Sequence, residues 1–106
     1  KQAYMTKEYW TLSEVIEIFQ MDEGTISYLE EEEIVCPECF DEQPAKRFSA
    51  IELEKLRLAK VLIEDMDVNL PGVEVILRMR ENMIQMRRQF DAILEDLAGQ
   101  FKESLK

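Results

Sequence analysis

The amino-acid sequence predicts a mainly helical protein in which a winged helix-turn-helix is followed by a long helix with coiled-coil spacing. Two short segments with helical spacing of apolar residues flank the turn QMDEG. The segment 34–48 contains prolines and breaks the helical pattern, and apolar residues then recur in heptads near the C-terminus. We therefore expect an N-terminal extension at residues 1–8, the winged helix-turn-helix at 9–68, and a C-terminal helix at 69–106 that mediates dimerisation.

The first helix is expected to begin after Thr11, in the segment TLSEVIEIF. Thr11 is a favoured N-cap residue, and Glu14 three positions later completes a capping box, in which each side chain accepts a hydrogen bond from the other residue's backbone N–H. Asp22 is the expected N-cap of a second helix, which runs from about residue 23 to residue 32. The apolar residues of that helix that face the core are Ile26 and Leu29, flanked by Tyr28.

The segment after the second helix predicts a β-hairpin wing, because Pro37 and Pro44 are incompatible with a continuous helix. Its strands are expected at residues 34–35 and 46–48. A third helix is expected after Ser49, its N-cap, with Glu52 three residues later as in a capping box. The apolar face of this helix, which ends near Glu64, consists of Ile51, Leu53, Leu56, Leu58, Ala59, Leu62 and Ile63.

The last helix is expected to begin at Asn69, a favoured N-cap residue, with Pro71 in its first turn. A helix of about 30 residues spans ~45 Å and would extend well beyond so small a domain. We therefore favour a seam between two chains over packing against the third helix of the same chain, although its methionines make the seam adaptable. The predicted dimerisation residues, spaced three and four apart, are Ile76, Met79, Met83, Met86, Phe90, Ile93 and Leu97.

The charges are unevenly distributed along a chain whose formal net charge is −10. Between Lys7 and Lys46 the sequence contains carboxylates but no lysine or arginine. This segment is either a solvated acidic face that maintains solubility or a surface that selects a basic partner. Four arginines cluster in the last helix: Arg78, Arg80, Arg87 and Arg88. They could form ion pairs with Glu81, Asp91 or Glu95, on the same helix or on a second one. Alternatively, they could bind an acidic partner or the acidic helix-turn-helix of a second copy.

Catalysis is not expected, because the chain contains no histidine and no pattern typical of a nucleophile–base pair or a phosphate-binding glycine loop. The sequence indicates no cofactor. No apolar run approaches the ~20 residues that span a bilayer, and no signal-peptide pattern is present, so we expect a cytoplasmic protein.

Cys36 and Cys39 have the CxxC spacing of half a zinc site or of a redox pair. A structural zinc ion needs four ligands, so this motif would have to be completed by a second chain. A thioredoxin-like role lacks the βαβ context that it requires. We favour two reduced thiols over a local disulfide or an inter-chain zinc site, and we predict no metal centre within one chain.

The order of these elements resembles that of MerR-like winged helix-turn-helix proteins over residues 9–79. The resemblance depends on the wing end Arg47-Phe48-Ser49 with Glu52, and on the segment VNLPGVEVIL at 68–77. The latter segment is similar to the heat-shock-linked branch, which includes the repressor HspR and, closer to this sequence, chaperone-modulator proteins of the CbpM type.

The second helix departs from the DNA-binding members of this family. Those proteins commonly have Thr-Leu-Arg-Tyr-Tyr-Glu where residues 25–30 here are TISYLE, so that Ser27 replaces an arginine. DNA-binding domains gain affinity by neutralising phosphates with Lys and Arg, and two like charges ~8 Å apart repel by about 2 kcal/mol at an effective dielectric near 20. Nucleic acid is therefore not the expected partner of this helix.

The resemblance to CbpM-type proteins implies a partner instead, the J-domain of a DnaJ- or CbpA-like co-chaperone, whose action with the Hsp70 protein DnaK would be inhibited. A basic J-domain helix would complement the acidic face. The alternatives are a MerR- or HspR-type DNA-binding transcriptional regulator and a dimeric adaptor with another basic partner. The predicted partner-binding residues are Asp22, Glu23, Ser27, Tyr28, Glu30, Glu31, Glu32, Glu33 and Phe40.

Overall fold

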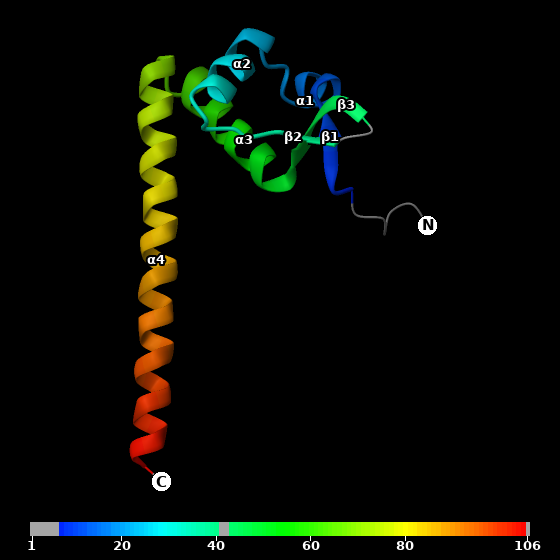
Figure 1. Cartoon of the computed structure of the whole chain (residues 1–106). Helices are drawn as coiled ribbons and strands as arrows, with labels where there is room; N and C mark the ends of the chain where they lie inside the picture. The colour runs from blue at the N-terminus through cyan, green and yellow to red at the C-terminus, as the bar shows by residue number, and fades with distance from the viewer. Residues whose placement is uncertain (1–6, 41–42, 106) are drawn as a thin grey trace.

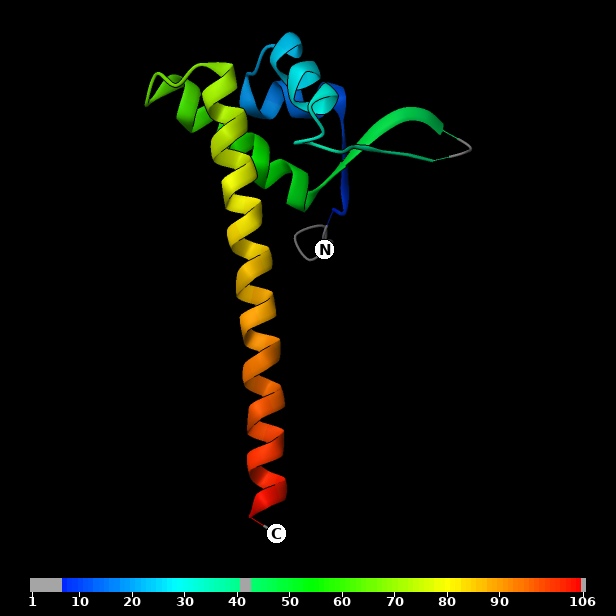
Figure 2. The ribbon, with the colours of Figure 1, turned by 60° about the vertical axis from the view of Figure 1, so that its left-hand side comes forward.

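The computed structural model describes residues 7–40 and 43–105 and confirms a mainly helical winged helix-turn-helix with a long C-terminal helix. The long helix forms a rod, and the other elements lie beside its N-terminal end (Figure 1). The wing projects away from this rod (Figure 2). The elements in chain order are β1 (Tyr9–Thr11), α1 (Leu12–Phe19), α2 (Glu23–Glu31), β2 (Glu38–Phe40), β3 (Gln43–Ser49), α3 (Ala50–Glu64) and α4 (Leu70–Ser104).

The predicted capping box at the start of α1 is confirmed. Thr11 Oγ1 accepts a hydrogen bond from the Glu14 backbone N–H at 3.2 Å, and Glu14 Oε1 accepts one from the Thr11 N–H at 2.9 Å. α1 ends at Gln20, whose left-handed backbone (φ 53°) turns the chain towards α2. Asp22 is the N-cap residue of α2 as predicted, but its side chain accepts no capping hydrogen bond.

The wing belongs to a three-stranded antiparallel sheet with the strand order β1-β3-β2. Trp10 pairs with Phe48 across β1 and β3, and Glu38 pairs with Arg47 across β2 and β3. Phe48 is fully buried, so the sheet is joined to the core at this residue. The sequence did not predict β1, because a three-residue strand shows no periodicity and is defined only by its distant partner.

The strand predicted at Ile34–Val35 is wrong. The backbone N–H groups of both residues donate to the Leu29 carbonyl, at 2.9 and 3.2 Å, and thereby terminate α2. Both side chains are buried in the core. Their apolar, β-branched character therefore reflects their role as core residues after a helix and not as strand residues.

The helix α3 begins after Ser49 as predicted, but the expected capping box is absent. Ser49 makes no side-chain capping bond, and Glu52 Oε1 accepts instead from the Cys36 backbone N–H at 2.9 Å. Ile51 was predicted to face the core, and this prediction is wrong, because its side chain is 67% exposed while Leu53 of the same turn packs against the core. The apolar face of α3 has Leu56 and Ala59 fully buried at its centre, with Leu53, Leu58, Leu62 and Ile63 partly buried around them.

The helix α4 begins at the predicted cap, where Asn69 Oδ1 accepts from the Gly72 N–H at 2.9 Å. Val73 and Leu77 are buried where α4 packs against α3. Its 35 residues give a length of about 52 Å, and every residue from Gln85 to Leu105 is exposed. Among the described residues, no helix combines the length and apolar character needed to cross a lipid bilayer. The buried core consists of Val15, Met21, Ile26, Leu29, Ile34, Val35, Phe48, Leu56, Ala59, Val73 and Leu77.

Candidate functional site

The carboxylates at the two ends of α2 differ in how accessible they are. Asp22 and Glu23 at its start are exposed, as are Glu31 and Glu33 at its end. The two other carboxylates of this group, Glu30 and Glu32, are partly buried because each interacts with a basic side chain from another element. The structure therefore separates the predicted acidic residues into an exposed set and a paired set.

The wing lysine is paired with the acidic helix. Lys46 Nζ donates to Glu30 Oε1 at 2.7 Å, and the Glu30 side chain is only 15% exposed. Arg47, the adjacent cation in β3, is half-buried. The positive charge that the wing could offer to a phosphate is therefore directed in part towards α2.

Arg78 of α4 binds the C-terminal end of α2. Its Nη2 donates to the Glu32 carbonyl oxygen at 2.7 Å and lies 3.1 Å from Glu74 Oε2. A cation at this position is favourable, because the last carbonyl groups of a helix carry partial negative charge. The contact partly offsets the unfavourable placement of consecutive glutamates at a helix C-terminus.

A second contact joins α2 to the first turns of α4. The Tyr28 hydroxyl donates to Glu74 Oε1 at 3.0 Å. This hydrogen bond lowers the pKa of the Glu74 carboxyl, and Arg78 acts in the same direction. The same bond raises the pKa of Tyr28, because ionisation would remove the donated proton beside a carboxylate. Tyr28 is thus a half-buried residue that connects the two helices.

The end of α2 is a Schellman motif with glutamate where glycine is usual. The Ile34 N–H donates to the Leu29 carbonyl and the Glu33 N–H donates to the Glu30 carbonyl, both at 2.9 Å. Glu33 accordingly has a left-handed backbone with φ of 60°. Its carboxylate is thereby exposed at the surface where α2 ends.

The remaining predicted residues of the site lie in less defined positions. Ser27 is half-buried on α2, and Cys36 is a free, exposed thiol. The side chains of Cys39 and Phe40 lie outside the described part of the structure, although both residues belong to β2. Within the described ranges, no group of three potential metal ligands occurs.

The predicted seam residues of α4 are exposed and share one face. Their exposed fractions range from 39% for Ile76 to 67% for Met86, whereas the buried Leu77 lies on a different face, against α3. The seven-residue stripe is therefore not packed against α3 of its own chain. Of the neighbouring arginines, Arg78 pairs with Glu74 and Glu32, and the others form no ion pair with any described residue. No pair with Glu81, Asp91 or Glu95, the partners considered from the sequence, therefore forms within the described part of one chain. These others are Arg80, Arg87 and Arg88.

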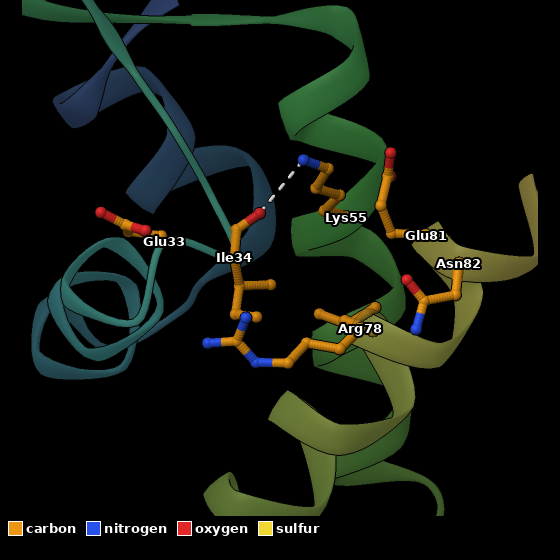
Figure 3. A pocket seen from close by; sticks show the side chains of 7 residues that line it. Glu33, Ile34, Lys55, Arg78, Glu81 and Asn82 are labelled. Atoms are coloured by element: carbon orange, nitrogen blue, oxygen red, sulfur yellow. Dashed lines mark hydrogen bonds between the residues drawn. The ribbon is translucent and has the colours of Figure 1, made fainter. Parts of the chain in front are cut away.

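A cavity lies between the end of α2, α3 and α4 (Figure 3). Its volume is about 310 Å³, and it is lined by Glu33, Ile34, Lys55, Leu77, Arg78, Glu81 and Asn82. Sequence reasoning singled out Glu33, Arg78 and Glu81 but could not place them together, because they come from separate elements.

Comparisons with known proteins bear on the family of this chain. A search of curated proteins found no match. A family model described as "MerR HTH family regulatory protein" matches residues 10–94, which include the helix-turn-helix, the wing, α3 and much of α4. The chain therefore belongs to the MerR family of helix-turn-helix regulatory proteins.

Proposed function

We propose that this protein is a chaperone modulator that binds the J-domain of a DnaJ- or CbpA-like co-chaperone and inhibits its action with the Hsp70 protein DnaK. The observation that carries this proposal is the ion pair between Lys46 of the wing and Glu30 of α2. In a DNA-binding winged helix-turn-helix, these two elements supply cations to the phosphates. Here they bind each other, and the surface around them keeps exposed carboxylates.

Three other cations near the helix-turn-helix also form ion pairs within the chain. Lys7 pairs with Glu14, Lys55 pairs with Glu52, and Arg57 pairs with Glu54. The first and third of these pairs are exposed and individually weak, so the pairs do not prevent DNA binding by themselves. Together with an α2 that contains no cation, they leave little positive potential to attract a phosphate backbone.

The exposed carboxylates fit a basic protein surface better than a nucleic acid. Asp22, Glu23, Glu31 and Glu33 lie at the two ends of α2. Opposite charges speed the encounter of two proteins and set their orientation, whereas apolar contacts supply most of the lasting affinity. The resemblance of residues 68–77 to CbpM-type proteins supplies the identity of the basic partner, a J-domain with its basic second helix.

A DNA-binding transcriptional regulator is the second candidate. The match to a family of helix-turn-helix regulatory proteins favours it, because that match covers α2 and the wing. Both candidates predict binding through the same surface, but to partners of opposite charge. Salt-dependent binding to a J-domain and to duplex DNA therefore distinguishes them.

We infer further that two copies associate along the exposed stripe of α4. A stripe of large apolar side chains on a projecting helix is costly to leave in water, and its heptad spacing matches a two-helix seam. The part of α4 beyond Gln85 has no buried residue in the single chain, whereas most of the stability of helices in proteins comes from tertiary packing of an apolar face. A second copy would provide the packing that this segment lacks.

The proposed function is tested by fluorescence anisotropy with a labelled J-domain of a CbpA-type co-chaperone and, separately, with labelled random duplex DNA at low salt. We expect J-domain binding that weakens with added salt, and inhibition of J-domain-stimulated DnaK ATPase activity. The variant Glu23→Gln/Glu31→Gln should bind the J-domain more weakly. DNA binding at micromolar concentration without J-domain binding would refute the proposal in favour of the second candidate.

A matched control separates local contacts from net charge. Glu17→Gln/Asp65→Asn removes the same number of charges from exposed carboxylates that form no ion pair with described residues. This control should retain the J-domain affinity of the unaltered protein apart from a small uniform change at low salt. Equal weakening in both double variants would show that only the total charge matters.

A further inference from the structure

The cavity at the end of α2 has an apolar floor and a charged rim. Ile34 and Leu77 are 6% and 5% exposed and form the floor. Glu33 lies beside Ile34 at one edge, with its carboxylate directed away from Ile34, whereas Glu81 and Asn82 project from α4 at the opposite edge (Figure 3). Three elements that are distant in sequence therefore contribute to one small, amphipathic cavity.

The cations that line this cavity are already bound by the protein. Lys55 Nζ donates to the Ile34 carbonyl oxygen at 3.1 Å (Figure 3). It also lies 3.3 Å from Glu52 Oε1. Arg78 donates to the Glu32 carbonyl oxygen at 2.7 Å and pairs with Glu74. Their charges are therefore compensated within the chain.

The carboxylates that line the cavity are not compensated in this way. Neither Glu33 nor Glu81 forms an ion pair with any described residue, and Glu81 accepts only a hydrogen bond from the neutral Gln85 side chain, at 3.1 Å. The unmatched charge of the cavity is therefore negative. Its ligand should be a cation with an apolar stem that can cover Ile34 and Leu77, a combination found in lysine and arginine side chains.

We propose that this cavity receives one lysine or arginine side chain of the basic partner, an inference that rests on the proposed J-domain binding. The stem would lie on Ile34 and Leu77, and the charged end would reach Glu81, or Glu33 after a rotation of its exposed side chain towards the cavity. A volume of about 310 Å³ is at the lower end of the range of about 300–1,000 Å³ for small-molecule sites, and it suits one long side chain. The cavity adjoins the exposed acidic end of α2, so a partner helix bound there would be within reach.

The assignment adds α4 to the binding surface. Glu81 and Asn82 lie outside the helix-turn-helix and would not contact a partner that bound α2 and the wing alone. Binding of a J-domain helix across α2 and the start of α4 would use both Glu31 and Glu81. The effect of a substitution at Glu81 therefore tests the cavity independently of the acidic helix.

The experiment measures J-domain affinity, by anisotropy, for the unaltered protein, for Glu81→Gln alone, which leaves the acidic end of α2 intact, for the cavity variant Glu33→Gln/Glu81→Gln, and for the charge-matched control Glu17→Gln/Asp65→Asn. The cavity variant loses charged hydrogen-bond acceptors for the partner's cation, so its Kd should increase roughly ten- to hundredfold. The Kd of the control should increase less than about twofold. Circular dichroism of each variant checks that the fold is retained.

Methyl NMR gives a second readout that requires no substitution. The methyl signals of Ile34 and Leu77 should shift when the unlabelled J-domain is added, whereas those of Val15, buried in the core away from the cavity, should not. J-domain binding with unshifted Ile34 and Leu77 signals and equal affinities of the two double variants would overturn the cavity assignment and leave the proposed function intact. Failure of the unaltered protein to bind the J-domain would overturn both.

Discussion

The substitution Met83→Glu tests the inferred seam at its centre. Met83 lies near the middle of the apolar stripe and is 66% exposed in the single chain. A glutamate at this position is compatible with an exposed helix, so the fold of the single chain should be unaffected. In a two-helix seam, by contrast, the same glutamate would be buried among apolar side chains.

The size of the effect follows from the exposed fraction of Met83. Complete burial of a methionine side chain is worth about 1.5–3 kcal/mol, and about two-thirds of that surface remains available for pairing, which gives roughly 1–2 kcal/mol per chain. The substitution occurs twice in a dimer, so the loss is about 2–4 kcal/mol. Since each 1.4 kcal/mol is tenfold, the dimer Kd should rise roughly 30- to 700-fold, and desolvation of the carboxylates adds to this value.

Sedimentation equilibrium over a series of protein concentrations measures this change in Kd. Ala92→Glu is the control, because it introduces the same charge at an exposed position of α4 that is outside the stripe. Far-UV circular dichroism provides a second measurement, since the segment from Gln85 onwards should lose helicity when the partner helix is removed. An unaltered protein that remains monomeric, or equal dimer affinities for Met83→Glu and Ala92→Glu, would refute the reasoning.

Two further predictions concern the stability of the junction between α2 and α4. Glu33→Gly should raise the free energy of unfolding in urea by roughly 0.5–1 kcal/mol, because glycine adopts a φ of 60° without steric cost; a lower value would show that the glutamate side chain stabilises this turn. The pKa of Glu74 is lower in the folded protein than its usual 4.5, so its contribution to stability is present above about pH 4.5 and is lost as the pH falls through the folded-state pKa. Urea unfolding at a series of pH values should therefore show a smaller acid-induced loss of stability in Glu74→Gln than in the unaltered protein, and identical pH profiles would contradict the assignment.

The elements that depend on local chemistry could be predicted from the sequence. The capping box of Thr11 and Glu14 and the Asn69 cap each involve residues three positions apart, so a short motif contains the whole interaction. The spacing of the α4 stripe likewise placed its residues on one face. Glu52 shows where local motifs fail as predictors. Its carboxylate accepts a hydrogen bond from the Cys36 N–H, 16 residues away in sequence, and does not form the expected capping box with Ser49.

Contacts across the fold could not be predicted in this way. The strand β1 exists because Trp10 pairs with Phe48, and neither residue indicates the other in the sequence. The sequence shows which residues in and around α2 are acidic, but their division into paired and exposed carboxylates depends on where Lys46 and Arg78 lie in space. Charge counts describe the surface as a whole, whereas accessibility is a property of each residue.

The contacts between α2 and α4 link the two proposed interactions physically. Tyr28 and Arg78 tie α2 to the first turns of α4, and α4 continues without interruption into the exposed stripe. Pairing of two copies along the stripe would therefore fix the positions of two acidic surfaces relative to each other. A co-chaperone with two J-domains could then bind both surfaces, and its second contact would be intramolecular and strengthened by effective concentration. Loss of the seam through Met83→Glu should accordingly weaken binding of a two-J-domain partner while leaving the affinity for an isolated J-domain unchanged.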